Sequence, residues 1–241
     1  MKKLICFCLA LLCLFSVCAC KDDDPSPESP PVYEVKKQTS DVIFNGKDYG
    51  DISMLYLALD GLEEANELLL SIALRHRDMK LPNLSSYGED DMPEVTYETE
   101  KISVTYLSAD FISAKVEGTL TVSLAPHPEP FVYTVNIDLK NNREFPSADI
   151  VKDFDKIKEL FRMERFELSY GDEKLVSETT LEDMIMQYHT EYEIYPYFYF
   201  TRDKLFMNIE LVYTLGSNAG YSIPLSDVKE HLNDEITKII K

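Results

Sequence analysis

The sequence predicts an α+β fold in which helices pack on one face of a mainly antiparallel sheet. Several segments alternate apolar and polar residues with period two, which is typical of strands with one covered face. Other segments repeat apolar residues every three or four positions, which is typical of helices that bury one stripe. The chain is also long and apolar enough to bury a core as one domain or two small lobes, with 241 residues of which 45% are hydrophobic.

The first elements expected are strands, a helix and a loop. The strands are Val32–Lys36, Val42–Asn45 and Met54–Leu59. A helix is predicted from Leu62 to about Leu74, because its apolar residues share one face. The stretch Met79–Pro93 is rich in charged and turn-forming residues, which favours a loop before strands resume at Val95.

Three strands in the middle of the chain show the clearest alternation. They are Ile102–Tyr106, Leu120–Leu124 and Tyr133–Leu139. Ser147 or Asp149 can then cap a helix whose apolar side runs from Ile150 to Phe161. A second helix is expected over Thr180–His189.

The closing part is predicted to contain two more strands and a last helix. The strands are Tyr192–Phe200 and Leu205–Tyr213, joined by the polar turn Thr201–Lys204. Ser226 is expected to cap the final helix, whose apolar residues are Val228, Leu232, Ile236, Ile239 and Ile240.

The first twenty residues are typical of an export signal. Lys2 and Lys3 precede an apolar run that is too short to span a bilayer, which needs roughly 20 residues. Cys20 directly after the small residue Ala19 resembles a lipobox, so we expect removal of residues 1–19 and lipidation of Cys20. Two or more acyl chains would anchor the protein firmly. An ordinary cleaved secretory signal is the alternative.

The segment after Cys20 suggests where the anchored protein is displayed. Lys21, Asp22 and Asp23 resemble the signal that sends lipoproteins to the outer face of the outer membrane in some Gram-negative bacteria. A solvated run of charges is the alternative. Residues 20–31 are charged and rich in Pro and Ser, which predicts a flexible tether, and residues 32–241 are expected to form one globular domain.

Cysteine content and charge exclude several classes of function. All five cysteines lie at positions 6, 8, 13, 18 and 20, so the processed chain has no disulfide framework, no free thiolate nucleophile and no cysteine metal site. Loss of Lys2 and Lys3 lowers the basic residues from 24 to 22 against 43 acidic ones, a net charge of −21. Nucleic acid would be repelled by this charge.

No motif for metal or cofactor chemistry is present. The histidines at 76, 127, 189 and 231 form no HExxH pair, so neither zinc nor another metal is expected. His127 lies between two prolines and is interpreted as shaping a turn; His189 with Glu191 and Glu193 fits an exposed helix end better than a metal site. The chain has no nucleotide-binding glycine motif, and we expect no cofactor.

A cluster of aromatic residues near the end allows two interpretations. Its members are Tyr188, Tyr192, Tyr195, Tyr197, Phe198, Tyr199 and Phe200. Core packing of a strand is favoured, and a partly exposed binding patch is the alternative, because tyrosines supply rigid amphipathic contact area.

Several motifs recur in a known order along the chain: Leu62–Leu69, Ala125–Pro128, Tyr133–Asn141, Ser147–Phe154, Phe198–Leu205, Ala219–Gly220 and Ile223–Ser226. This order resembles the extracellular domain family shared by the anti-sigma factor RsiV and the N-terminal part of the peptidoglycan deacetylase PdaC. The pair Ala219–Gly220 matches an Ala-Gly turn of that family. The resemblance implies an exported module, and the family's lysozyme binding makes a basic lysozyme a candidate partner.

Three departures from the family pattern bear on that partner. Gly is missing before Ala125, Asn142 replaces a turn Gly, and Glu210–Leu215 replaces a Tyr-Glu-Ile-Ala-Pro-Tyr segment. A ligand surface built there would differ.

The leading hypothesis is a surface-displayed, lipid-anchored, non-enzymatic binding or sensing module. The alternative is an enzyme that acts on cell-wall or other glycans through a pair of carboxylates, since such pairs are defined by their spacing in space rather than in sequence.

Overall fold

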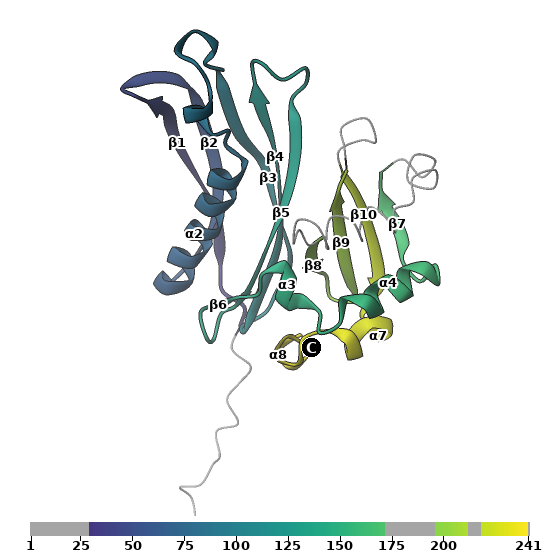
Figure 1. Cartoon of the computed structure of the whole chain (residues 1–241). Coiled ribbons are helices and arrows are strands. Elements are labelled where there is room, and N and C mark those ends of the chain that lie inside the picture. The colour runs from purple at the N-terminus through teal and green to yellow at the C-terminus, as the bar shows by residue number, and fades with distance from the viewer. Residues whose placement is uncertain (1–28, 172–195, 212–217, 241) are drawn as a thin grey trace, which may run out of the picture.

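The computed structural model describes residues 29–171, 196–211 and 218–240 (Figure 1). Two sheets and several short helices make up this part of the chain. The elements before the midpoint are β1 (Tyr33–Phe44), β2 (Lys47–Leu59), α2 (Glu63–Lys80), two 3-10 turns (Leu84–Ser86 and Glu89–Asp91), β3 (Val95–Leu107) and β4 (Phe111–Val122). The elements after it are β5 (Glu129–Asp138), β6 (Arg143–Glu144), α3 (Ser147–Ile150), α4 (Phe154–Arg162), β7 (Glu167–Tyr170), β8 (Tyr197–Phe200), β9 (Lys204–Glu210), β10 (Asn218–Pro224), α7 (Leu225–Val228), a 3-10 turn (Lys229–His231) and α8 (Asp234–Ile239).

The first sheet has the strand order β1-β2-β3-β4-β5-β6 and is covered on one face by α2 (Figure 1). Its neighbours are antiparallel except β2 and β3, which are parallel because α2 carries the chain back between them. The N-terminal core lies between this helix and the sheet and uses residues from Val42 to Leu139.

The second sheet has the order β7-β10-β9-β8 and is antiparallel throughout. It lies beside β5, with α4, α7 and α8 gathered at one end (Figure 1). The C-terminal core packs Phe111 of β4 against residues from Phe145 to Ile240. Tyr170 crosses directly over Gly220 of the central strand β10, where an added Cβ would lie 2.0 Å from the tyrosine ring.

A polar seam joins the two sheets. We use this name for Ser113 of β4 and Asn136 of β5, which are 0% and 2% exposed. The Ser113 hydroxyl donates to the Asn136 side-chain oxygen at 2.8 Å, and the Asn136 amide donates to the carbonyl of Phe198 at 2.8 Å. The N–H of Phe200 donates to Ser113 at 2.9 Å. Strand β8 is therefore held against the first sheet by hydrogen bonds as well as by apolar contact.

The predicted α+β class is confirmed, and the mainly antiparallel strands form two sheets. The strands expected at 32–36 and 42–45 are one continuous strand, β1. The first helix is confirmed but extends six residues beyond Leu74, to Lys80. The three central strands are also confirmed, although β4 begins at Phe111 and ends at Val122, which leaves Leu124 exposed in the following turn.

Two predicted helices are interrupted. The helix expected from Ile150 to Phe161 is wrong as one element, because Val151 pairs with Leu232 and Asp153 then caps α4 by accepting the N–H of Asp155. The final helix is likewise divided, and the assignment of its cap to Ser226 is wrong. Ser226 lies inside α7, which has no side-chain cap, and Asn233 caps α8 instead.

Two features of the family pattern take a definite form. The prediction of a turn at Ala219–Gly220 is wrong, since both residues lie in β10, where only a glycine leaves room for the ring of Tyr170. Asn142 has φ 47°, the left-handed conformation that a turn glycine commonly adopts, so this substitution preserves the turn. The helix expected over Thr180–His189 lies outside the described residues.

Candidate functional site

A cavity of about 410 Å³ opens between α2, β5 and β8, and we call it the His76 cavity. Its walls include the apolar side chains of Ile72, Met79 and Tyr133 and the half-buried ring of Tyr197. His76 lies on its wall. Cavities that are mostly apolar with a few polar groups are typical of small-ligand sites.

His76 is placed by the apolar face of α2. It is 3% exposed and follows Leu69 and Ala73 on the same stripe of the helix. Its ring stacks on Tyr133 with centroids 4.1 Å apart, and its Nδ1 lies 3.1 Å from the hydroxyl of Tyr97. In the part of the chain that the structure describes, Nε2 has no hydrogen-bond partner. This nitrogen is therefore a buried polar group with unused bonding capacity, which is rare in native proteins.

The surroundings of His76 determine its charge. Burial first, and then the nearby ammonium of Lys80, lower the pKa of His76 to about 3. The ring is consequently neutral near pH 7, with one N–H and one bare nitrogen. Burial also raises the pKa of Tyr97 to about 12, so its hydroxyl stays protonated. A general base works best with a pKa near the working pH, so this site suits hydrogen bonding better than proton transfer.

Charged groups on the wall of the His76 cavity, and others close to His76, are engaged with one another. Arg75 of α2 forms an ion pair with Glu144 of β6 at 2.5 Å. Lys80 at the end of α2 pairs with Glu210 of β9 at 2.9 Å and with Glu129 of β5 at 3.1 Å. Burial alone would lower the pKa of Lys80, but these two carboxylates outweigh it and hold the pKa above its usual value.

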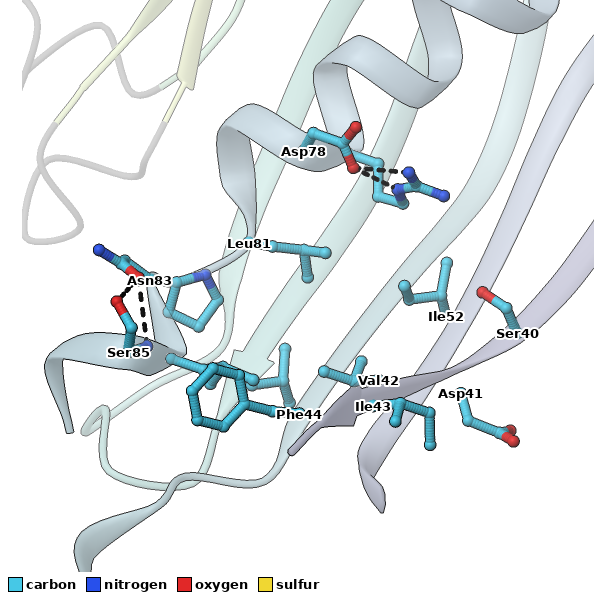
Figure 2. A pocket seen from close by; sticks show the side chains of 14 residues that line it. Ser40, Asp41, Val42, Ile43, Phe44, Ile52, Asp78, Leu81, Asn83 and Ser85 are labelled. Carbon is cyan, nitrogen blue, oxygen red and sulfur yellow. Dashed lines mark hydrogen bonds and ion pairs between the residues drawn. The ribbon is translucent and has the colours of Figure 1, made fainter. Parts of the chain in front are cut away.

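A second cavity, of about 430 Å³, lies beyond the C-terminal end of α2 (Figure 2). Figure 2 shows Val42, Phe44 and Ile52 of the first two strands facing Leu81. Several of its polar side chains have local partners. Asp78 forms an ion pair with Arg77 at 2.6 Å, and the Asn83 side chain accepts the N–H of Ser85.

A third cavity, of about 500 Å³, lies where β5 and β6 meet α8. Asp138 and Glu235, two of the three carboxylates that line it, have structural partners. Asp138 accepts the N–H groups of Lys140 and Asn141 and so shapes the turn before β6. Glu235 forms an ion pair with Arg143. In these three cavities, Glu144, Asp78, Asp138 and Glu235 are thus already held by neighbouring groups.

Of the histidines and aromatic residues named from the sequence, the structure brings His76 and Tyr197 together at the His76 cavity and places the other described histidines elsewhere. His127 lies in the exposed turn between β4 and β5, and His231 lies in the 3-10 turn before α8. In β8, Phe198, Tyr199 and Phe200 are 0%, 6% and 0% exposed, which favours core packing for this part of the aromatic cluster. In the described ranges no three His, Cys, Asp or Glu side chains form a group suited to a metal ion.

Several predicted site residues lie outside the described residues. They are Cys20, Lys21, Asp22, Asp23, Tyr188, His189, Glu191, Tyr192, Glu193 and Tyr195. Within the described residues, no helix is both long and apolar enough to cross a membrane.

Sequence reasoning considered His76 only as a possible metal ligand and did not predict its burial beside a cavity. The predicted helix ended at Leu74, two residues too early to include it. The signal was nevertheless present, because position 76 continues the stripe of Leu69 and Ala73 at spacings of seven and three residues. A histidine on an apolar stripe is a recognisable candidate for a buried polar group.

Comparison with known proteins identifies the fold. No protein-family model matches the chain, and no curated protein matches it. A solved DUF3298 family protein from Bacteroides fragilis is 14% identical with a TM-score of 0.50, covering 90% of this chain and 99% of that one. One from Pseudomonas aeruginosa is 10% identical with a TM-score of 0.53, covering 86% and 96%. The chain therefore shares its fold with solved structures of DUF3298 family proteins.

Proposed function

We propose that this chain is a lipid-anchored, surface-exposed binding or sensing module of the bacterial cell envelope, without enzymatic activity. The observation that carries the proposal is the His76 cavity. It combines apolar and aromatic walls with a neutral histidine whose Nε2 has no partner among the described residues. The pKa of about 3 makes His76 a poor proton acceptor for catalysis near neutral pH, whereas it can still give or accept a hydrogen bond.

Two further observations support an envelope module. Lys2, Lys3 and the apolar run before Cys20 have the pattern of a lipoprotein signal. The shared fold with DUF3298 family structures fits an RsiV-like extracellular domain. The link to the PdaC family, the lipid on Cys20 and display on the outer membrane are parts of this proposal.

The alternative is a glycan-cleaving enzyme that uses two carboxylates. The three cavities offer it limited support, because four of their six lining carboxylates are already engaged: Glu144, Asp78 and Glu235 are in ion pairs and Asp138 shapes a turn. Turnover assays of the exported chain on peptidoglycan and on a panel of glycans separate the two functions. We expect no turnover. Activity that is lost when one pair of Asp or Glu residues is replaced by Asn or Gln would establish the enzyme instead.

The anchor is tested by replacing Cys20. Cys20→Ala should release the chain from membranes and leave the precursor uncut before residue 20, because the sulfur that carries the lipid is gone. Membrane fractionation and the mass of the N-terminus report both effects. Unchanged fractionation with the membranes would refute lipidation at this residue.

Surface display is tested separately from the anchor. Replacing Lys21, Asp22 and Asp23 together by Ala should keep the lipid but retain the domain inside the outer membrane. Protease treatment of intact cells should then no longer remove the domain. If protease removes the domain from intact cells as completely as in the wild-type chain, these residues are only a solvated charge run.

A basic lysozyme is the partner that the family resemblance suggests. The net charge of −21 after signal removal would attract such a protein over a long range. Calorimetry of the processed chain with lysozyme should show one-to-one saturation that survives about 0.3 M salt, where the Debye length is roughly 6 Å. Loss of binding at that salt, or equal binding of an unrelated basic protein, would reduce the lysozyme interaction to nonspecific attraction.

A further inference from the structure

Strand β1 presents an outer edge that no strand among the described residues covers. It is the first strand in the order of its sheet, and β2 pairs with only one of its sides. Eleven residues of β1 pair in register with β2, and the one irregularity, between Asp41 and Ile43, places the extra residue on β2. Ten of the twelve residues of β1 are exposed. An uninterrupted edge of this kind is a template for pairing with another strand.

One side of β1 has a symmetric arrangement of residues around Thr39. Alternation along the strand brings Val35, Lys37, Thr39, Asp41 and Ile43 to this side, and all five are exposed. Val35 and Ile43 are among the large apolar residues that remain in contact with solvent, at 46% and 59% exposure. Figure 2 shows the Asp41 carboxylate directed away from Leu81. The order is thus apolar, cation, Thr, anion, apolar.

We propose that β1 pairs with β1 of a second copy of this chain, antiparallel and centred on Thr39. A two-fold axis perpendicular to the sheet relates the two strands, which requires residues of the same parity to lie opposite one another. Centred on Thr39, Lys37 of each copy lies opposite Asp41 of the other, and Val35 lies opposite Ile43. The pairing joins the two first sheets into one continuous sheet across the axis.

The side chains on this side of the strand favour this register. Directly opposite side chains in an antiparallel pair lie about 4.5 to 5.5 Å apart, so two ion pairs and two apolar pairs form at once. With the centre moved to Gln38, Lys37 would lie opposite Thr39 and Val35 opposite Asp41, so both kinds of pair are lost. Lysine on an edge strand ordinarily discourages pairing. Here the carboxylate of Asp41 neutralises the charge of Lys37 in this register alone, so the two residues favour one partner strand and one register.

Thiol cross-linking of the full-length chain, with its five native cysteines replaced by Ser, tests the geometry. All native cysteines lie at or before position 20, so Thr39→Cys introduces the single thiol of the folded domain. Because Thr39 faces its own copy across the axis, oxidation should give a covalent dimer, with Cα atoms within disulfide range. Gln38→Cys is the matched control. Its side chain lies on the other side of the strand and opposite Ser40, so its dimer yield should be at least about tenfold lower than that of Thr39→Cys.

Charge reversal in the Thr39→Cys background tests the register. Lys37→Asp places a carboxylate opposite the Asp41 carboxylate at each of the two contacts. The rate of cross-linking should therefore fall about tenfold. Adding Asp41→Lys restores opposite charges and should restore the rate. Two differently tagged chains, one with Lys37→Asp and one with Asp41→Lys, should also cross-link to each other in preference to themselves. Lys36→Asp, which changes the charge equally on the other side of the strand, should leave the rate unchanged.

The outcomes separate specific pairing from folding defects and chance collisions. Equal dimer yields from Thr39→Cys and Gln38→Cys, or a monomer in both, would overturn the pairing. Cross-linking that ignores the charge reversals would overturn the register. Rescue by the double variant and mutual pairing of the tagged single variants cannot arise from unfolded chains, so these two results would establish the interface.

Discussion

The N-terminal and C-terminal cores differ in what they bury. The C-terminal core is dominated by aromatic and aliphatic side chains, including Phe198 and Phe200, although the hydroxyl of Tyr221 has no partner among the described residues. The N-terminal core encloses His76 of α2 among aromatic rings, and Thr99 of β3 is also buried. A buried polar group without a hydrogen-bond partner destabilises a fold. Such groups therefore mark functional sites more often than ordinary apolar core residues do.

The largest effect should come from truncating a ring in either core. Phe131→Ala removes a 1% exposed ring from the N-terminal core, and Phe200→Ala a fully buried ring from the C-terminal core. Each should lower the free energy of unfolding by about 3 to 5 kcal/mol. Because the polar seam links the cores, both variants should unfold in a single transition in urea, followed by far-UV and near-UV circular dichroism. Two separate transitions would show that the cores are independent.

The pH dependence of stability should distinguish the cores next. An unfolded chain protonates His76 below about pH 6.5, whereas the folded chain does so only below about 3. This contribution to stability is complete above pH 6.5 and is lost as the pH falls between these values. Between pH 6.5 and 4.5 the loss is about 2 kcal/mol.

Urea unfolding at these two pH values measures the effect. His76→Phe keeps a ring in the stack and should remove that part of the acid sensitivity, whereas the exposed His127→Gln should keep it. An acid slope that is the same in wild type and His76→Phe would mean that His76 is protonated as readily in the folded chain as in the unfolded one.

The polar seam should contribute a smaller amount. Asn136→Ala leaves the Phe198 carbonyl and the Ser113 hydroxyl without their bonds to Asn136, which should cost roughly 1 to 3 kcal/mol. Hydrogen exchange should rise in β8 and β9 more than in β3. Asn141→Ala, which alters an amide in an accessible turn of the same sheet, is the control. Equal exchange in both sheets would deny the seam a role in coupling them.

The smallest effect should come from the ion pair between the cores. Lys80→Met removes the contact from α2 to Glu210 of β9 while keeping a long apolar stem. The expected loss is about 1 kcal/mol, because the pair is only partly buried. The raised pKa of Lys80 means that this stabilisation is present near neutral pH and is lost in strong base. No difference from wild type at low salt would make the pair incidental to stability.

The local patterns of the sequence predicted the elements of the N-terminal core well. Alternation in β3 and β5 and the apolar stripe of α2 depend on residues close together in the chain, so period and spacing reveal them. The division into two sheets was beyond such reasoning. Strand β10 pairs with β7, about fifty residues earlier in the chain, and the position of Gly220 under Tyr170 exists only in the folded chain.

The candidate site was less predictable than the fold. The His76 cavity is assembled from α2, β5, β6 and β8, and no short motif records that convergence. The helix boundaries failed for a related reason. Asp153 and Asn233 are ordinary capping residues, but Val151 and Leu232 interrupt the helical stripes to pair with each other across the fold.

The composition of the C-terminal core has a consequence for the order of assembly. Phe111 of β4 belongs to this core, and so do Ile236 and Ile240 near the end of the chain, which are 0% and 6% exposed. The core is therefore incomplete until these last residues are in place. The buried residues of the N-terminal core lie between Val42 and Leu139, and from the later part of the chain Tyr197 of β8 packs against it. During synthesis the chain can therefore bring together most of its first core while the second still exposes aromatic side chains. During that interval the growing chain is most vulnerable to proteases and most in need of a chaperone.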